Sequence, residues 1–493
     1  MRAMTLPRIA KAVDGKLFIN GKRYYMGEAV FPEGTGINEA IDYNECSSLV
    51  IDSRKIEKDS VFVATVGAKV DGHSFIAQVF EKGAMGVICE KGPADWGCID
   101  FEDGKPVQDF GNGMPYIIVE NSFDALKKLA TYYRSVMSDV KCVGIVGSVG
   151  KTSTKELVAS VLSQHFRTYK TEGNFNNEVG VPLTVLSIRD EHEAAVIEMG
   201  ISDFGEMDRL GAIVKPDAVV MTNIGPCHLE KLIDLDGVLR AKTECIKHMA
   251  KDGFLVLNRD DEKLAAIKSA GRRSILYYGS AGDVSAEEIE SLGLEGSRFI
   301  MNAAGQKIEC MVPLPGKHMV WNALAAAAVG LELGMEITDI AAGIAAVKPV
   351  SGRSNLIRTD NYLVVDDCYN ANPKSMKAAI DLMGYARGRK CAILGDMFEL
   401  GGNAEALHAE VGEYAAGKID FLICVGELSR NMYDSYQNGN DRENADAQAL
   451  YFESTEELAK HLAELKFMPQ DTILVKASHG MEFSKIVRLL TAE

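Results

Sequence analysis

Residues 144–154 read GIVGSVGKTST, a glycine-rich run that ends in Lys151 and Thr152. The apolar segment Cys142–Val146 precedes the glycines, and the helix-favouring segment Lys155–Leu162 follows them. A strand, a glycine-rich turn and a helix N-terminus together expose backbone N–H groups that wrap a phosphate chain. This stretch therefore predicts an α/β fold with a nucleoside triphosphate site.

The loop departs from the usual phosphate-loop spacing. Ile145 occupies the position of the expected first glycine, and an extra glycine, Gly147, stands inside the loop. We therefore expect a subclass of phosphate loop, in which Lys151 neutralises β- and γ-phosphate oxygens and the Thr152 hydroxyl binds Mg²⁺. The predicted nucleotide-binding residues are Gly147, Ser148, Val149, Gly150, Lys151, Thr152 and Ser153.

Length and composition exclude several classes of protein. A chain of 493 residues exceeds one hydrophobic core, so we expect three domains. The net charge of -17 argues against a nucleic-acid surface, which needs clustered Lys and Arg. The most apolar later stretch, Ala323–Leu333, contains Gly330 and Glu332 and is too short to span a bilayer. Ten cysteines without a CxxC pair indicate reduced thiols, so we expect a cytoplasmic protein with no membrane partner.

Short apolar runs mark a small α/β unit over 47–90, with a helix expected at Ser74–Lys82. The Gly-, Asp- and Pro-rich stretch 91–115 is the best candidate for a linker. From Leu126 onward, VGIVG, AAVIEMG, DAVVMTNIG and FLVLNRD alternate with helical segments, which predicts a mostly parallel sheet.

An antiparallel patch (SRFIMN, IECMVPL) and a helix at Val320–Leu333 follow, and then NYLVVDDC, KCAILGD, FLICVG and TILVKAS begin a second alternation. This last unit is Rossmann-like but lacks GxGxxG, so no dinucleotide is expected there. The predicted fold is α/β in three domains: a small N-terminal α/β domain (1–118), a central phosphate-loop domain with a parallel sheet (119–349) and a C-terminal Rossmann-like domain (350–493).

Three residues near strand ends are candidates for the chemistry. Glu198 ends the AAVIEMG strand, where a carboxylate facing the glycine loop would complete a Mg²⁺ shell with Thr152. His228 follows a strand and a Gly-Pro turn, although a histidine there is more often a surface or capping residue. Lys242 lies on a predicted helix, where a lysine is ordinarily solvated.

An ordered series of motifs resembles the Mur ligases of peptidoglycan synthesis over about residues 50 to 485. The series is GIVGSVGKTST, TEGNFNNEVGVPLTVL, VIEMG, TNIGPCHLE, AKTE, NALAAAA, DDCYNANPKSM, LGDMFELG and VKASHGM. Within that family, GNFNNEVGVPL and DDCYNANPKSM resemble the member that adds D-alanyl-D-alanine to UDP-N-acetylmuramoyl-tripeptide. The resemblance implies an ATP-dependent carboxylate-amine ligase that works through an acyl phosphate, and it suggests a monomer.

The resemblance also assigns roles to residues. Thr152 and Glu198 would hold one Mg²⁺, and His228 would help to hold a second. Lys242 corresponds to a lysine that many relatives carry as a carbamate, which converts a repelled ammonium into an anionic ligand. Together with Lys151, the acid, imidazole and amine groups form the expected catalytic set.

Other roles implied by the resemblance concern the two substrates. Asn322 matches an adenine-contacting asparagine, Arg353 a residue that reaches the γ-phosphate, and Asp367 one that reaches the ribose. Met319 stands where relatives often carry a second asparagine. The residues implied in substrate binding are Ser53, Arg54, Asp71, Gly72 and His73 for the UDP end, and Asn174, Asn176 and Asn177 beside the glycine loop.

The C-terminal VKASHGM departs from the more frequent SRSM ending: Ser478 and Met481 remain, while His479 and Gly480 replace Arg-Ser. Three alternatives stay open on the residues alone. The ligase that adds the third peptide residue and a folylpolyglutamate synthase-like enzyme share the chemistry. A phosphate-loop switch or partitioning ATPase would need neither His228 nor Lys242.

Overall fold

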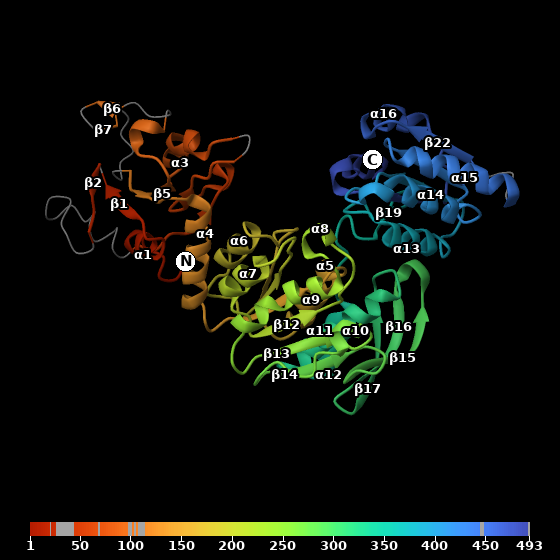
Figure 1. The fold of residues 1–493 in the computed structure, drawn as a ribbon, viewed down its shortest axis with the longest axis horizontal. Helices are drawn as coiled ribbons and strands as arrows, with labels where there is room; N and C mark the ends of the chain where they lie inside the picture. Colours follow the sequence, from red (N-terminus) through yellow and green to blue (C-terminus); the bar gives the residue numbers. More distant parts are fainter. Residues whose placement is uncertain are drawn as a thin grey trace. The chain divides into compact units, whose positions relative to one another are not determined.

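The computed structural model describes residues 1–19, 21–25, 44–67, 70–96, 101–102, 105–106, 114–443 and 448–491. These residues form sheets of six, nine and six strands and a two-stranded ribbon (Figure 1). Contacts divide the chain into two compact units, Met1–Ser285 with Leu324–Ile340, and Ala286–Ala323 with Ala341–Glu493. Much of the predicted linker 91–115 lies outside the described residues, but β6 (Phe101–Glu102) and β7 (Lys105–Pro106) pair antiparallel within it.

The first six-stranded sheet has the order β2-β1-β8-β5-β4-β3. Strands β3, β4, β5 and β8 pair in parallel, and β1 pairs antiparallel with its neighbours. The expected helix at Ser74–Lys82 is a 3₁₀ turn, η2, followed by α3. The bounds are α1 Leu6–Ala12, β1 Lys16–Ile19, β2 Lys22–Arg23, β3 Leu49–Val50, η1 Ser53–Lys55, β4 Val61–Val63, η2 Gly72–Phe75, α3 Ile76–Glu81, β5 Gly86–Cys89, η3 Pro93–Asp95 and β8 Tyr116–Ile118.

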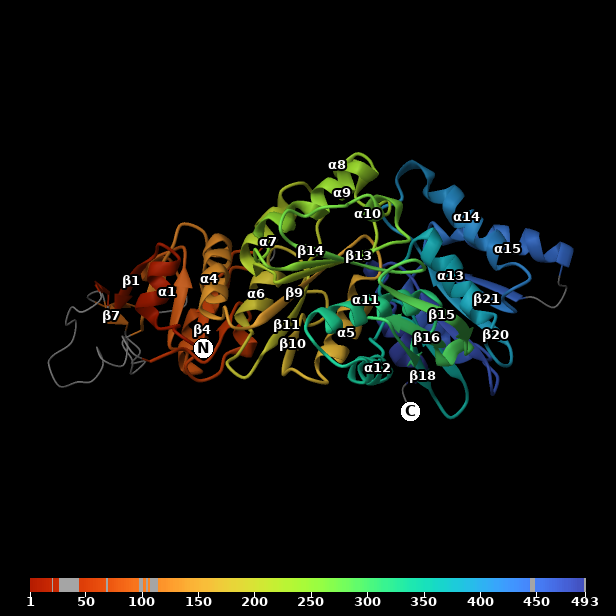
Figure 2. The same ribbon diagram turned by 90° about the horizontal axis from the view of Figure 1, so that it is seen from below.

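The nine-stranded sheet has the order β10-β11-β9-β12-β13-β14-β15-β16-β17. Its strands β10 to β14 are parallel, as the alternation predicts, and Figure 2 shows β9, β11 and β10 side by side. Strands β16 and β17 form the expected antiparallel patch. The strand bounds are β9 Lys141–Val146, β10 Thr168–Lys170, β11 Ala194–Glu198, β12 Ala218–Met221, β13 Phe254–Asn258, β14 Ser274–Tyr278, β15 Val284–Ser291, β16 Ser297–Ala303 and β17 Gln306–Val312.

Helix α4 (Ser122–Val136) precedes these strands. The helices between and after them are α5 Lys151–Leu162, α6 Gly180–Leu186, α7 Glu206–Val214, α8 Leu229–Leu232, α9 Leu235–Thr243, η4 Glu244–His248, α10 Glu262–Ala265, η5 Gly293–Glu295, α11 His318–Glu332 and α12 Ile337–Ala345. Helix α5 begins at Lys151, four residues before the predicted start, because the left-handed Gly150 (φ 84) turns the chain directly into the helix. The glycine loop therefore ends at the first turn of α5.

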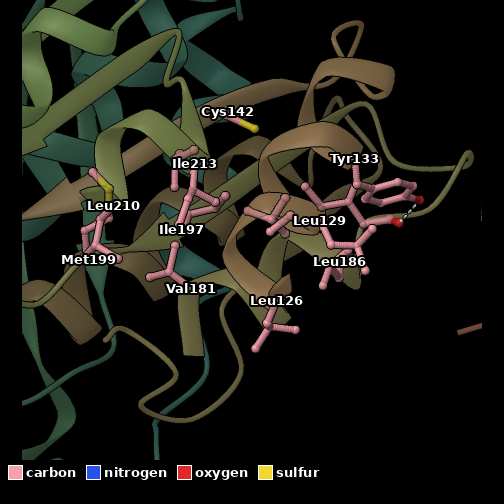
Figure 3. Close-up of a cluster of buried hydrophobic side chains, with 14 of the residues drawn as sticks. Leu126, Leu129, Tyr133, Cys142, Val181, Leu186, Ile197, Met199, Leu210 and Ile213 are labelled. Carbon is pink, nitrogen blue, oxygen red and sulfur yellow. Dashed lines mark hydrogen bonds between the residues drawn. The ribbon is translucent and has the colours of Figure 1, made fainter. Parts of the chain in front are cut away.

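Helix α4 packs against α6 and α7 on one face of the nine-stranded sheet. Leu126, Leu129 and Tyr133 of α4 meet side chains of these helices and of β11 in a buried cluster (Figure 3). The Tyr133 hydroxyl donates a 2.7 Å hydrogen bond to the Ile188 carbonyl, so this buried ring leaves no orphaned polar group. The cluster supports β9 and β11, the strands that carry the glycine loop and Glu198.

The last sheet, in the second unit, has the order β18-β19-β23-β20-β21-β22. Its core is parallel, and β18 is an antiparallel edge strand that the sequence patterns miss, as they miss β22. Apolar clusters cover both faces, as a doubly wound layer requires. The bounds are β18 Asn355–Arg358, β19 Leu363–Asp366, α13 Pro373–Met383, β20 Lys390–Gly395, η6 Gly401–Asn403, α14 Ala404–Ala415, β21 Phe421–Val425, α15 Ser429–Glu443, β22 Gln448–Phe452, α16 Thr455–His461, η7 Leu462–Glu464, β23 Thr472–Lys476, η8 His479–Met481 and α17 Ser484–Thr491.

Among the helices of the described residues, none combines the length and the apolar character that crossing a bilayer requires.

Candidate active site

The glycine loop is held against the end of β12. A Cβ built on Gly147 (φ 154) would lie 1.9 Å from the Thr222 Oγ1 atom, so only glycine fits. The Val149 carbonyl accepts hydrogen bonds from Thr222 Oγ1 (2.6 Å) and Asn223 Nδ2 (2.9 Å), and the Val149 N–H donates to Asn223 Oδ1 (3.0 Å). No side chain caps the N-terminus of α5, and the backbone N–H groups of a helix N-terminus are suited to an anion.

Two lysines converge on this loop. Lys151 Nζ donates to the Gly147 carbonyl (2.9 Å), and Lys242 Nζ from α9 donates to the same oxygen (3.1 Å). Lys242 is 2% exposed, so it does not follow the ordinary expectation of a solvated helix lysine. Burial, reinforced by the positive charge of Lys151, lowers the pKa of Lys242 to about 8. The pair concentrates positive charge where phosphate oxygens would lie.

Glu198 stands at the end of β11, opposite Ile145 of β9 in the parallel register. Its side chain is buried, and its Oε1 atom accepts a 2.7 Å hydrogen bond from Asn176 Nδ2. Its Oε2 atom is also buried but has no hydrogen-bond partner. A buried carboxylate oxygen without a donor is costly unless a cation faces it. The carboxylate therefore fits the predicted role of a Mg²⁺ ligand.

His228 lies at the rim of the loop, exposed, with a left-handed backbone (φ 51) at the N-terminus of α8. Its neighbour Cys227 has Sγ 3.3 Å from Ser148 Oγ, and the Gly225 N–H donates to Ser148 Oγ (3.0 Å). These contacts place the segment that carries His228 against the glycine loop. The described residues contain no cluster of three or more His, Cys, Asp or Glu side chains suited to a metal ion.

The three asparagines next to β10 have different environments. Asn176 binds Glu198, as above, whereas Asn177 Oδ1 accepts the N–H groups of Val179 (3.1 Å) and Gly180 (2.8 Å) at the start of α6. Asn174 is exposed, and its carbonyl accepts the Asn176 N–H (2.7 Å). Asn177 therefore shapes the loop through its side chain, and Asn174 offers an exposed amide.

In the first sheet, the Arg54 guanidinium makes two hydrogen bonds to Asp52, from Nε (2.9 Å) and Nη2 (2.8 Å). These bonds lower the pKa of Asp52 to about 2. Lys82 Nζ donates to the Ser53 carbonyl (2.9 Å). The exposed guanidinium is thus pre-oriented by Asp52, and a guanidinium is suited to diphosphate oxygens.

His73 is buried, and both of its ring nitrogens bind within the protein. The Glu90 N–H donates to Nε2 (3.0 Å), so the proton resides on Nδ1, which donates to Asp71 Oδ1 (2.6 Å). Lys91 Nζ donates to the other oxygen of Asp71 (2.8 Å). This bond, followed by the one from the backbone N–H of His73, lowers the pKa of Asp71. A Cβ on Gly72 would lie 2.9 Å from backbone atoms of Thr65. The imidazole therefore braces this loop through its ring nitrogens.

Arg353 and Asp367, two of the predicted nucleotide-binding residues, lie in the second unit. The Arg353 guanidinium stacks 3.9 Å from the centre of the Tyr369 ring, and its Nε atom is buried without a hydrogen-bond partner. Asp367 accepts the Ser354 N–H (2.9 Å) on Oδ1 and Lys476 Nζ (2.6 Å) on Oδ2. Sequence reasoning missed Lys476, whose only signal is its place at the end of a parallel strand.

Two further positions in this unit bear on the departures from the family pattern. Asn322 is buried in α11, and its Nδ2 atom lies 3.5 Å from the sulfur of Met319, the residue that replaces a second asparagine. Ser478 Oγ accepts the Phe398 N–H (2.8 Å), and the His479 ring lies 5.5 Å from the Tyr369 ring. Ser478 therefore braces the loop after β20.

Three family models match the chain. They are described as Mur ligase family, catalytic domain (residues 45–133), Mur ligase middle domain (145–330) and Mur ligase, glutamate ligase domain (352–479). Neither a nucleotide switch nor a partitioning ATPase is among them.

Curated relatives extend over almost the whole chain. A UDP-N-acetylmuramoyl-tripeptide--D-alanyl-D-alanine ligase of Bacillus subtilis (strain 168) is 34% identical over 95% of this chain and 98% of its own length. The ligase of the same name from Escherichia coli (strain K12) is 34% identical over 90% of this chain and 93% of its own length.

Solved structures agree with these relatives. MurF from Acinetobacter baumannii has a TM-score of 0.83 at 29% identity, covering 99% of both chains. The MurF ligase from Thermotoga maritima in complex with ADP has a TM-score of 0.71 at 28% identity, covering 90% of this chain and 97% of its own. With three matching family models and relatives above 30% identity along its length, the chain belongs to the Mur ligase family.

Proposed function

We propose that this chain is the ATP-dependent ligase that joins D-alanyl-D-alanine to UDP-N-acetylmuramoyl-tripeptide in peptidoglycan precursor synthesis, with ADP and phosphate as products. The names of the relatives and the ADP complex of a homologous structure support this assignment. The observation in the structure that carries it is the glycine loop, on which Lys151 and the buried Lys242 converge.

The chemistry requires activation of an acid. A carboxylate is a poor electrophile at neutral pH, so the γ-phosphoryl group of ATP is first transferred to it, giving an acyl phosphate. The amine of D-alanyl-D-alanine then attacks, and the tetrahedral intermediate expels phosphate. Positioning and charge neutralisation supply most of the catalysis. Lys151 and the N–H groups at the start of α5 would bind the phosphate oxygens.

The residues around the loop fit Mg²⁺, two ions of which we propose. Thr152 and Glu198 would hold one ion, and His228 with Lys242 the other. The metal would neutralise phosphate charge when bound. The unpartnered Oε2 of Glu198 supports this role. The lowered pKa of Lys242 supports carbamylation, because the neutral amine is the form that reacts with CO₂.

The remaining contacts follow the same proposal. Ser53, Arg54 and the Asp71–His73 loop would serve the UDP end of the muropeptide, with Asn174, Asn176 and Asn177 on the acceptor side. Asn322, Arg353 and Asp367 would contact the nucleotide.

We further propose three domains, a UDP-muropeptide domain at 1–118, an ATP-binding domain at 119–349 and a C-terminal ligase domain at 350–493, in a monomeric cytoplasmic enzyme.

A phosphate-release assay tests the function. With ATP present, release is expected only when UDP-muramoyl tripeptide and D-alanyl-D-alanine are both supplied. Equal release with either substrate omitted would rule the proposal out. A panel of amine acceptors, including single amino acids and glutamate, separates this activity from that of the other family members. D-alanyl-D-alanine is expected to be preferred.

A further inference from the structure

Lys155 is a buried cation on the helix that begins at the glycine loop. It follows Lys151 by one turn, so the two side chains lie on the same face of α5. Lys155 is 1% exposed. Burial of an ammonium is costly, and a lysine persists there only when its N–H groups are matched by acceptors.

Three protein oxygens contact the Lys155 ammonium. Its Nζ atom donates to the carbonyls of Thr171 (2.7 Å) and Gly173 (3.4 Å), and it forms an ion pair with Glu156 Oε1 (3.2 Å). The other oxygen of Glu156 pairs with Lys170. The buried ammonium lies against these three protein oxygens, so its contribution to the reaction passes through the segment that it holds.

That segment leads to Glu198 by two routes. The Thr171 Oγ1 atom accepts the Glu198 N–H (3.0 Å), and the Thr171 N–H donates to the Val196 carbonyl (3.0 Å), which fixes Thr171 beside β11. Asn176 at the far end of the segment donates to Glu198 Oε1 (2.7 Å), and its carbonyl accepts the Gly200 N–H (2.8 Å). The backbone and the carboxylate of Glu198 are thus both held by the chain between Thr171 and Asn176.

We propose that Lys155 is a positioning residue for the ligase reaction: it ties the phosphate-binding helix to segment 171–176, which orients the Glu198 carboxylate. The inference rests on the proposed function, in which Glu198 binds the metal of the nucleotide complex. Loss of the ammonium releases the Thr171 and Gly173 carbonyls, so Glu198 loses its fixed orientation. The glycine loop keeps its own contacts to Thr222 and Asn223.

The test compares Lys155→Met with wild type. Replacement of a residue that orients a metal ligand typically lowers activity or metal affinity about 10- to 100-fold. We expect a fall of this size in kcat and in Mn²⁺ affinity, the latter measured by electron paramagnetic resonance with a non-hydrolysable ATP analogue. The dissociation constant of metal-free ATP and the KM for D-alanyl-D-alanine are expected to stay at wild-type values.

Two further variants make the result specific. Lys170→Met, an exposed neighbour that shares the Glu156 partner, is the matched control and is expected to match wild type. In an Asn176→Ala background the bond from Asn176 to Glu198 Oε1 is already lost, so Lys155→Met is expected to have a smaller effect than in the wild-type background, through the Thr171 route alone. An effect of Lys155→Met that is equally large in the wild-type and Asn176→Ala backgrounds would overturn the proposal. Wild-type kcat and Mn²⁺ affinity in the Lys155→Met enzyme would also overturn it.

If Lys155→Met does not fold, Thr171→Val tests the proposal in its place, because it removes only the hydroxyl that accepts the Glu198 N–H. It is expected to lower kcat and Mn²⁺ affinity in the same way, and an unaffected Thr171→Val enzyme would overturn the proposal. Failure of the wild-type enzyme to release phosphate with both substrates would instead refute the proposed function.

Discussion

Lys242 shows how surroundings override the ordinary behaviour of a residue type. A lysine on an amphipathic helix normally extends into water, whereas this one donates to the Gly147 carbonyl from a buried position beside Lys151. Burial of the ammonium lowers the pKa of Lys242 most, and repulsion from the Lys151 ammonium on the same carbonyl lowers it further. Such a destabilised group is typical of a functional site.

Replacement of Lys242 by alanine tests this placement. We expect Lys242→Ala to lower kcat by about 100-fold or more, as loss of one charge-stabilising group does at other active sites. ATP affinity, measured by calorimetry, is expected to persist because the glycine loop and Lys151 are intact. Lys247→Ala, which removes an exposed lysine paired with Asp208, is the control. Full turnover in Lys242→Ala would contradict the site assignment.

Gly147 supports a second prediction at the same scale. A Cβ at this position meets Thr222 Oγ1 at 1.9 Å, so Gly147→Ala must displace the loop or β12. Overpacking of this kind costs about 1 to 3 kcal/mol. ATP affinity is expected to fall by about tenfold or more in a calorimetric titration. Gly402→Ala, where the added carbon meets nothing within 4 Å, should bind ATP normally; equal affinities in the two variants would show that the loop adapts.

At the scale of one element, α13 begins with a capping box. Asn372 Oδ1 accepts the Ser375 N–H (2.8 Å), and Ser375 Oγ lies 3.0 Å from the Asn372 nitrogen, which donates to it. Pro373 occupies the first helical position, where its missing N–H has no cost. The DDCYNANPKSM motif therefore contains a helix start as well as candidate substrate contacts.

Asn372→Ala is expected to destabilise α13 by about 1 kcal/mol, the usual loss for a missing N-cap. Hydrogen exchange of the α13 amides should accelerate about fivefold, which corresponds to that free energy. Lys374→Ala in the same turn is the control because it removes an exposed side chain and leaves the cap intact. Unchanged exchange in Asn372→Ala would show that packing alone holds this helix.

At the scale of the whole molecule, the C-terminal region contains a nearly complete set of packed layers. One apolar cluster lies between the sheet and α13, α14 and α15, and the other includes residues of α16 and α17. Among the described residues, Leu294 is the one buried member of these two clusters that lies before residue 350. Most of the apolar burial that would stabilise residues 350–493 is therefore internal to them.

A fragment of residues 350–493 is accordingly expected to fold on its own. It should show native α/β circular dichroism and one cooperative thermal transition. A coil-like circular dichroism spectrum, together with binding of a hydrophobic dye, would contradict the proposed boundary at 350. Because the fragment lacks Leu294, its free energy of unfolding is expected to be about 1 to 3 kcal/mol lower than that of the same region in the full chain.

Much of the fold and of the site follows from the sequence by itself. The strand alternation predicts the parallel cores of the second and third sheets, because buried parallel strands read as continuous apolar runs. The glycine loop, Glu198 and Lys242 are recognised from motifs whose order is specific. The edge strands β18 and β22 are missed, since half-buried edges carry a weak apolar pattern.

Only the tertiary structure decided which of these residues meet. It brings Lys242 and Lys151 to one carbonyl, leaves one Glu198 oxygen unpartnered and uses both ring nitrogens of His73 inside the protein. It also reveals Lys155, which motif spacing cannot distinguish from a solvated lysine. Local sequence determines backbone preference and apolar period, whereas burial and hydrogen-bond partners depend on segments distant in the chain, so the roles of buried charges emerge only after folding.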